Sequence, residues 1–175
     1  GLTAQHLRAA RARLTAPDAP CAPLAELLAQ PRERLETLGI PAAASAALAA
    51  PQAETIAADR AWVQRAHIAL IDADSALYPP LLAQTQTAPA LLYVQGDASA
   101  LCLPQLAMVG SRSPTESGRR TARQFAACLS QAGLTITSGM ALGIDAASHE
   151  GALAAGGRTI AVLGGGLDSI YPSQH

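Results

Sequence analysis

The chain has 175 residues, of which half are hydrophobic and 14% are charged, and its formal net charge is −1. This apolar fraction excludes a disordered chain. No apolar run is long and uncharged enough to span a membrane. With a net charge near zero, any nucleic-acid site must be a local patch rather than a field of the whole chain.

All 12 basic residues are arginine. The absence of lysine excludes a Walker-type phosphate loop and Schiff-base chemistry. The three cysteines are isolated along the sequence, which is typical of reduced thiols in a cytoplasmic protein and argues against a zinc ribbon. We therefore predict a cytoplasmic protein without a metal site.

Residues 1–66 show helical periodicity only. Apolar residues at helical spacing form one face near the start of the chain, at Leu2, Leu7, Ala10 and Leu14. Pro31 is placed to open a helix that Gly39 ends, and Pro41 and Pro51 open two more. Closely spaced turn signals predict short antiparallel helices in a small bundle.

The pattern changes near His67. Two candidate strands, 68–71 and 91–94, precede a regular alternation of strand 106–109, helix 118–131, strand 134–137, helix 144–155 and strand 159–163. This alternation predicts a parallel sheet with right-handed crossovers. We expect a helical domain over 1–66 and a Rossmann-like α/β domain over 67–175, its five-strand sheet incomplete at residue 175.

A glycine-rich turn follows each of the three predicted parallel strands. The turns contain Gly110, Ser111 and Arg112; Ser138, Gly139 and Gly143; and Gly164, Gly165 and Gly166. In a parallel sheet they lie together at the carboxyl edge, where helix amino ends and free amides face one crevice. The three together favour a phosphate-bearing ligand, although tight connections without a ligand also use glycine.

Three arginines could add positive charge to this edge. Arg112 lies within the first turn and could contact a phosphate with two prongs, or else pair with Glu116 on the surface. Arg119 and Arg123 lie one helical turn apart and could extend the basic surface, unless they belong to a solvated helix face.

Asp145 and His149 share a helix face at i, i+4 spacing. They are too few to bind a metal and have no G-x-S-x-G nucleophile, so we interpret them as a helix cap and a hydrogen-bonded histidine. Whether Asp145 and His149 contact a ligand stays an open question at this point. G-x-G-x-x-G is also absent, so we predict no catalytic residues and no cofactor.

Several motifs are similar to those of the DNA-processing protein A (DprA/Smf) family. They are Val109–Arg112, Ser138–Leu153, 157–163, 164–168 and Tyr171-Pro172, with Tyr78-Pro79 and 89–96 upstream. The resemblance covers about residues 70–175. The helical start resembles the sterile-alpha-motif-like or helix-hairpin-helix-like domain of many members.

This resemblance implies a cytoplasmic protein that binds single-stranded DNA during natural transformation, protects incoming strands and helps load RecA recombinase. It implies no enzymatic activity, and it implies a homodimer through segments beyond residue 175. At the matching positions, Gly110, Ser111 and Arg112 belong to the DNA pocket. The other glycine-rich residues, Ser138, Gly139, Gly143 and Gly164–Gly166, form its floor.

Two other functions stay open at this point. One is a nucleotide-binding or nucleoside-monophosphate-hydrolysing Rossmann-like enzyme. Such hydrolases carry P-G-G-x-G-T-x-x-E, whereas the third turn here lacks both the Thr and the Glu. The other is a helical interaction module over 1–66, in which Leu38-Gly39-Ile40 resembles a phosphate-holding hairpin or forms a simple helix stop.

Overall fold

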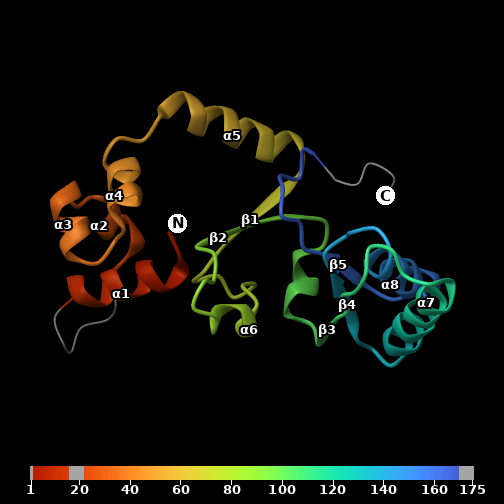
Figure 1. Ribbon diagram of the computed structural model, residues 1–175. Helices are drawn as coiled ribbons and strands as arrows, with labels where there is room; N and C mark the ends of the chain where they lie inside the picture. The colour runs from red at the N-terminus through yellow and green to blue at the C-terminus, as the bar shows by residue number, and fades with distance from the viewer. Residues whose placement is uncertain (1, 16–21, 170–175) are drawn as a thin grey trace. The chain divides into compact units, whose positions relative to one another are not determined.

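The computed structural model describes residues 2–15 and 22–169. The chain divides into two compact units, Gly1–Gly96 and Asp97–His175, which are coloured red to green and green to blue in Figure 1. No helix within the described residues is long and apolar enough to cross a membrane. The Tyr171-Pro172 motif lies outside the described residues.

The first unit begins with short helices, and those before residue 50 surround a common apolar core. The helices are α1 Ala4–Leu14, α2 Leu24–Leu28, α3 Arg32–Thr37, α4 Ala42–Ala49 and α5 Ala53–Arg65. Their core contains the buried residues Ala10, Leu27, Leu35, Leu38 and Ile40. The predicted small bundle is thus confirmed for α1–α4, whose apolar residues are buried together, whereas α5 contributes no buried residue to it.

Proline and glycine set the limits of these helices as the sequence predicts, with small shifts. Pro31 and Pro41 stand at the N-cap positions, one residue before the helices begin. Gly39 has φ +93°, a left-handed conformation that ends α3 at little steric cost.

A two-stranded antiparallel hairpin follows the helices. It pairs β1 Ile68–Asp72 with β2 Leu91–Gln95, and the short helix α6 Pro80–Ala83 lies in the connection between them. We expected these strands to extend the parallel sheet, and that expectation is wrong. They pair with one another because the chain between them folds back and allows five cross-strand residue pairs.

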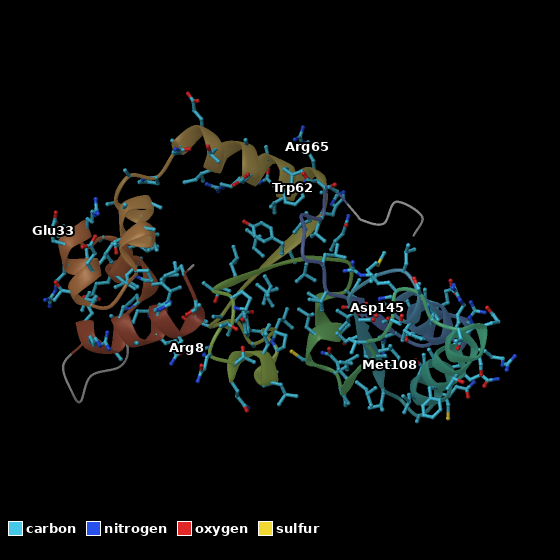
Figure 2. The ribbon with its side chains drawn as sticks, in the orientation of Figure 1. Arg8, Glu33, Trp62, Arg65, Met108 and Asp145 are labelled. Atoms are coloured by element: carbon cyan, nitrogen blue, oxygen red, sulfur yellow. The ribbon has the colours of Figure 1, made fainter. Side chains whose placement is uncertain are left out.

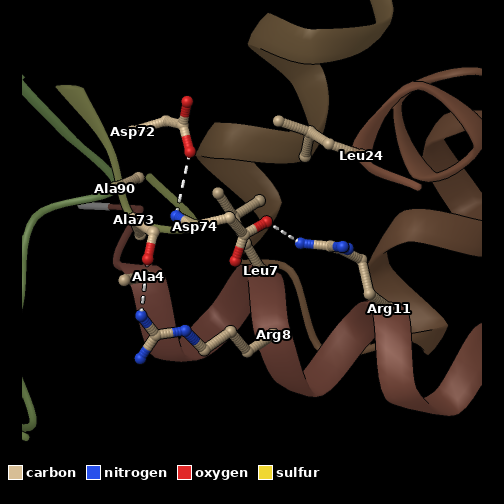
Figure 3. Close-up of a pocket in the computed structure, with 9 residues that line it drawn as sticks. All are labelled: Ala4, Leu7, Arg8, Arg11, Leu24, Asp72, Ala73, Asp74 and Ala90. Atoms are coloured by element: carbon tan, nitrogen blue, oxygen red, sulfur yellow. Dashed lines mark hydrogen bonds and ion pairs between the residues drawn. The ribbon is translucent and has the colours of Figure 1, made fainter. Parts of the chain in front are cut away.

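Helix α1 is hydrogen-bonded to this hairpin and its connection. The N–H of Ala4 donates to the carbonyl of Ala88, and the guanidinium of Arg8 donates to the carbonyl of Ala73 at 2.8 Å. Figure 3 shows Arg11 in an ion pair with Asp74 beside this contact. These bonds join α1 to the hairpin within the first compact unit, which ends at Gly96. The predicted domain boundary itself stays a prediction.

The second unit is a two-layer fragment of alternating strands and helices. After the 3₁₀ helix η1 Ala98–Cys102 come β3 Gln105–Ala107, α7 Glu116–Gln131, β4 Thr135–Ser138, α8 Ile144–Ala154 and β5 Thr159–Ala161. The strands are parallel in the order β3-β4-β5. Two right-handed crossovers in the same direction place α7 and α8 on one face of the sheet. The Rossmann-like α/β fold is confirmed.

Helices α7 and α8 cross closely because small residues lie at their contact. A Cβ atom at Gly151 of α8 would lie 2.9 Å from the Cα of Arg123 in α7 and closer still to its carbonyl oxygen. Ala126 of α7, Ala152 of α8 and Ile136 of β4 are fully buried beside this crossing. The backbone of α7 therefore leaves no room for a side chain at Gly151.

We predict that Gly151→Ala lowers the free energy of unfolding by about 1–3 kcal/mol, because the helices must separate. Urea denaturation followed by circular dichroism measures this loss. Gly165→Ala is the matched control, since no atom lies within 4 Å of its added Cβ, and it should leave stability unchanged or slightly raised. Equal stability of the two variants would contradict the close crossing.

Candidate nucleic-acid interface

The parallel strands bring the three glycine-rich turns to one edge of the sheet. Backbone pairing continues just past the strands: the N–H of Met108 donates to Thr137 at 2.9 Å, and that of Val162 to Ser138 at 2.8 Å. Each turn therefore begins directly after a paired segment at the carboxyl edge. This is the edge at which α/β sheets commonly bind ligands.

The first two turns are in direct contact. The N–H of Ile144, the first residue of α8, donates to the carbonyl of Ser111 at 3.1 Å. A Cβ at Gly110 would lie 2.7 Å from the Ile144 side chain, and one at Gly143 would lie 2.8 Å from the carbonyl oxygen of Arg112. Gly143 also has φ +89°. Only glycine satisfies both the conformation and the close approach at this position.

Asp145 fixes the second turn from within. Its buried carboxylate, 6% exposed, accepts hydrogen bonds through Oδ2 from the N–H of Gly139 at 3.1 Å and of Ala141 at 3.4 Å. Met140 between them has φ +62°, which is uncommon for a residue other than glycine. Figure 2 labels Asp145 in the second unit. Our interpretation of Asp145 as a helix cap is wrong: the N-cap residue of α8 is Gly143, with no side-chain cap hydrogen bond, and the Asp145 carboxylate instead bonds to amides of the preceding turn. The Gly139 amide is thereby already used within the protein.

Ser138 and His149 also make internal bonds. The buried hydroxyl of Ser138 donates to the carbonyl of Met108 at 2.6 Å and so ties β4 to the end of β3. The hydroxyl of Thr159 donates to the carbonyl of Ile136 and therefore accepts from Nδ1 of His149, at 2.6 Å. His149 thus joins α8 to the start of β5, as the hydrogen-bonded histidine of our interpretation.

Amides of the first and third turns remain as donors for a ligand. Gly110, Ser111 and Arg112 are exposed, and their N–H groups donate to no other residue that the structure describes. Gly164 and Gly165 are likewise exposed, with open space where a Cβ would be. Exposed amides without protein acceptors are the groups that hold phosphate oxygens at such edges.

The arginines differ in their ion pairs. Glu116 lies 3.9 Å from the guanidinium of Arg119, and Arg123 pairs with Glu150 of α8. No carboxylate among residues 2–15 and 22–169 pairs with Arg112. The alternative Arg112–Glu116 pair is therefore wrong, because Glu116 faces Arg119 one turn along α7. Arg112 alone of these three carries an uncompensated positive charge.

The hairpin-like Leu38-Gly39-Ile40 segment has no amide for a phosphate. The N–H groups of all three residues donate to carbonyls of α3 at 2.9–3.0 Å. Arg13 further covers the segment by donating to the carbonyl of Leu38 at 2.7 Å. This turn is a helix stop, in agreement with the simpler of the two interpretations. In the part of the chain that the structure describes, no cluster of three metal-ligating side chains occurs.

The family described as DNA recombination-mediator protein A matches residues 69–175. The chain belongs to this family. The matched region begins within β1 and contains all three turns of the carboxyl edge, while the helices α1–α5 lie outside it.

Curated proteins named Smf and DprA are similar to this chain over 56–70% of its length. Protein Smf of Escherichia coli (strain K12) is 44% identical over 122 residues, which is 70% of this chain and 33% of that protein. DNA processing protein DprA of Streptococcus pneumoniae is 43% identical over 56% of this chain and 34% of its own length. This chain therefore spans about a third of the length of these relatives.

Solved structures of the family agree with the fold. DNA processing protein A from Streptococcus pneumoniae superposes with a TM-score of 0.66 at 30% identity, over 83% of this chain and 50% of that one. A structure of DNA processing protein A from Helicobacter pylori, described for its single-stranded DNA binding mode, superposes with a TM-score of 0.54 at 31% identity. That match covers 62% of this chain and 49% of the Helicobacter pylori chain.

Sequence reasoning missed Met140 and Ile144. Nothing in the sequence marks Met140 for a left-handed conformation, because that conformation follows from the bonds to Asp145 on both sides of it. The contact of Ile144 with the first turn joins residues far apart in the chain. The glycine at 110 was the one local signal for it, since a glycine often marks a close approach.

We predict that Gly143→Ala disrupts the contact between the first two turns and speeds amide hydrogen exchange at Ile144, whose N–H bonds to Ser111. Gly133→Ala is the matched control, because Gly133 has a similar φ of +91° but nothing within 4 Å of its added Cβ. The control should lose about 1 kcal/mol to backbone strain, and Gly143→Ala should lose more. Equal losses would mean that the two turns do not press on one another.

Proposed function

We propose that this chain binds single-stranded DNA at the carboxyl edge of its parallel sheet. The observation that carries the proposal is the first turn: exposed amides of Gly110 and Ser111 without protein acceptors, beside the unpaired guanidinium of Arg112. These donors suit the non-bridging oxygens of a phosphodiester. The single-stranded DNA binding named for the Helicobacter pylori protein supports the same ligand.

The other predicted residues take supporting parts in this proposal. Ser138, Gly139 and Gly143 form the floor, because their polar groups or backbones contact the protein rather than open space. The turn 164–166 leaves room for the strand to pass. Arg119 and Arg123 border the site and add less attraction, since each faces a carboxylate.

Recognition by amides and a guanidinium is independent of base sequence. Phosphate contacts fix the position of a strand but read no bases. The chain has few aromatic residues, so a long base-stacking surface is not part of the proposal. We therefore propose that affinity depends on salt and little on the sequence of the oligonucleotide.

We predict that Arg112→Ala weakens binding of all oligonucleotides by about tenfold, the loss of one charged hydrogen bond. The slope of log K against log salt should fall by about 0.7, the value for one phosphate contact on a single strand. Fluorescence anisotropy of labelled oligo-dT and a mixed sequence, across a salt series, measures both quantities.

Arg158→Ala is the matched control for this prediction. Arg158 is exposed and directly precedes β5, so it carries the same charge at the amino edge of the same sheet. The control should bind as tightly as the wild-type chain. Should Arg112→Ala keep wild-type affinity and salt slope, or should the two variants weaken binding equally, the assignment of the first turn would be wrong.

We further propose the wider role of the family for the protein: a cytoplasmic DNA-processing protein of natural transformation that protects incoming strands, helps load RecA recombinase and acts as a homodimer. The family description as a recombination mediator and the 43% identity to the Streptococcus pneumoniae protein support this role. Adding the protein to single-stranded DNA should shorten the lag of RecA filament formation. An unchanged lag would contradict the loading role.

We propose binding rather than catalysis. The carboxylate best placed at the edge, Asp145, is buried and accepts two amide hydrogen bonds, so it is not poised to act as a general base. We expect no release of base from nucleoside monophosphates incubated with the chain. Release that is lost on Asp145→Asn or Asp168→Asn would instead support the hydrolase alternative.

A further inference from the structure

We infer that Asp145 is a positioning residue of the DNA-binding edge. It favours DNA binding by accepting hydrogen bonds that hold the edge in shape, although its negative charge repels phosphate. This inference rests on the proposed function, because it concerns the same site. The negative side chain of Asp145, which is 6% exposed, lies at the start of α8, next to the turn that we propose holds a phosphate. Charge alone would make it unfavourable there.

The hydrogen bonds of Asp145 converge on one atom. Both the Gly139 and the Ala141 N–H groups donate to Oδ2. One carboxylate oxygen thus holds the amides on both sides of Met140. Asp145 is also the second residue of α8, where the helix dipole favours a negative group. Two donors of this turn, the Gly139 and Ala141 N–H groups, are therefore taken by the protein's own anion rather than by a ligand.

The bonds to Asp145 also position the residues that contact the first turn. They hold Met140 in its left-handed conformation and fix the path of the chain into α8. The next contacts follow directly: Gly143 lies against the backbone of Arg112, and Ile144 donates to Ser111. Asp145 thus supports the carbonyl side of the first turn, whose N–H groups have no acceptor among the described residues.

Two substitutions separate the acceptor from the charge. Asp145→Asn removes the charge but keeps one carbonyl oxygen with two lone pairs, which is enough for both amides. Asp145→Ala removes the charge and the acceptor. If Asp145 acted only through its charge, both variants would bind DNA more tightly. A positioning role predicts opposite results for the two.

The experiment compares oligo-dT affinity of the wild-type chain, Asp145→Asn and Asp145→Ala by fluorescence anisotropy. We expect Asp145→Asn to bind as tightly as the wild type or more tightly, and Asp145→Ala to bind about tenfold more weakly. Asp168→Ala is the control for charge, because it removes an exposed carboxylate after β5 at the same edge. It should not weaken binding.

Thermal melts and amide exchange accompany the binding data. Gly139 and Ala141 should exchange faster in Asp145→Ala and at the wild-type rate in Asp145→Asn, at a temperature where both variants are folded. Equal affinities of Asp145→Ala and Asp145→Asn, in either direction, overturn the inference. The proposed function is judged separately by Arg112→Ala: a wild-type chain that binds in an Arg112-dependent manner keeps that function even if Asp145 does not position the edge.

Discussion

The contact between the first two turns of the parallel sheet is the constraint on which the binding edge depends. Strands β3 and β4 end side by side, and the start of α8 then presses on the backbone of Ser111 and Arg112. Because Gly110 and Gly143 have no side chains, the backbones of the first two turns approach closely. The N–H of Ile144 can then donate to the carbonyl of Ser111. Protein thereby occupies the carbonyl oxygen of Ser111, while the N–H groups of this exposed turn have no acceptor among the described residues. An edge with this polarity suits an anion.

The distribution of donors explains why the first turn, and not the start of α8, is the proposed phosphate site. A helix amino end is ordinarily an anion site, but at α8 the carboxylate of Asp145 already accepts from the neighbouring turn. The positive charges are divided in a similar way. Arg119 and Arg123 are balanced by Glu116 and Glu150, while Arg112 has no such partner among the described residues. Free amides and free charge therefore coincide at one turn.

The first unit is held together by a small apolar core and, in addition, by polar contacts between residues far apart in the chain. Arg8 and Arg11 of α1 bind the segment after β1, and Ala4 bonds to the chain before β2. The family match begins within β1, so the hairpin belongs by sequence with the α/β segment and by contacts with the helices. The boundary between the compact units, after Gly96, therefore differs from the start of the family match at residue 69. The unit that carries the glycine-rich turns nevertheless lies wholly within the matched region.

Local pattern in the sequence was sufficient to predict the short helices at the start of the chain, the alternation of parallel strands and helices, and the helix stop at Gly39. Each of these is determined by residues close together in the chain, through periodicity, proline or glycine. Tertiary structure decided the rest. The pairing of β1 with β2, the partner of Arg123, the left-handed Met140 and the free amides of the first turn all depend on residues brought together by folding. A backbone donor is available to a ligand only if no group of the protein has accepted its hydrogen bond. The sequence does not show this, because the acceptors come together only when the whole edge has folded.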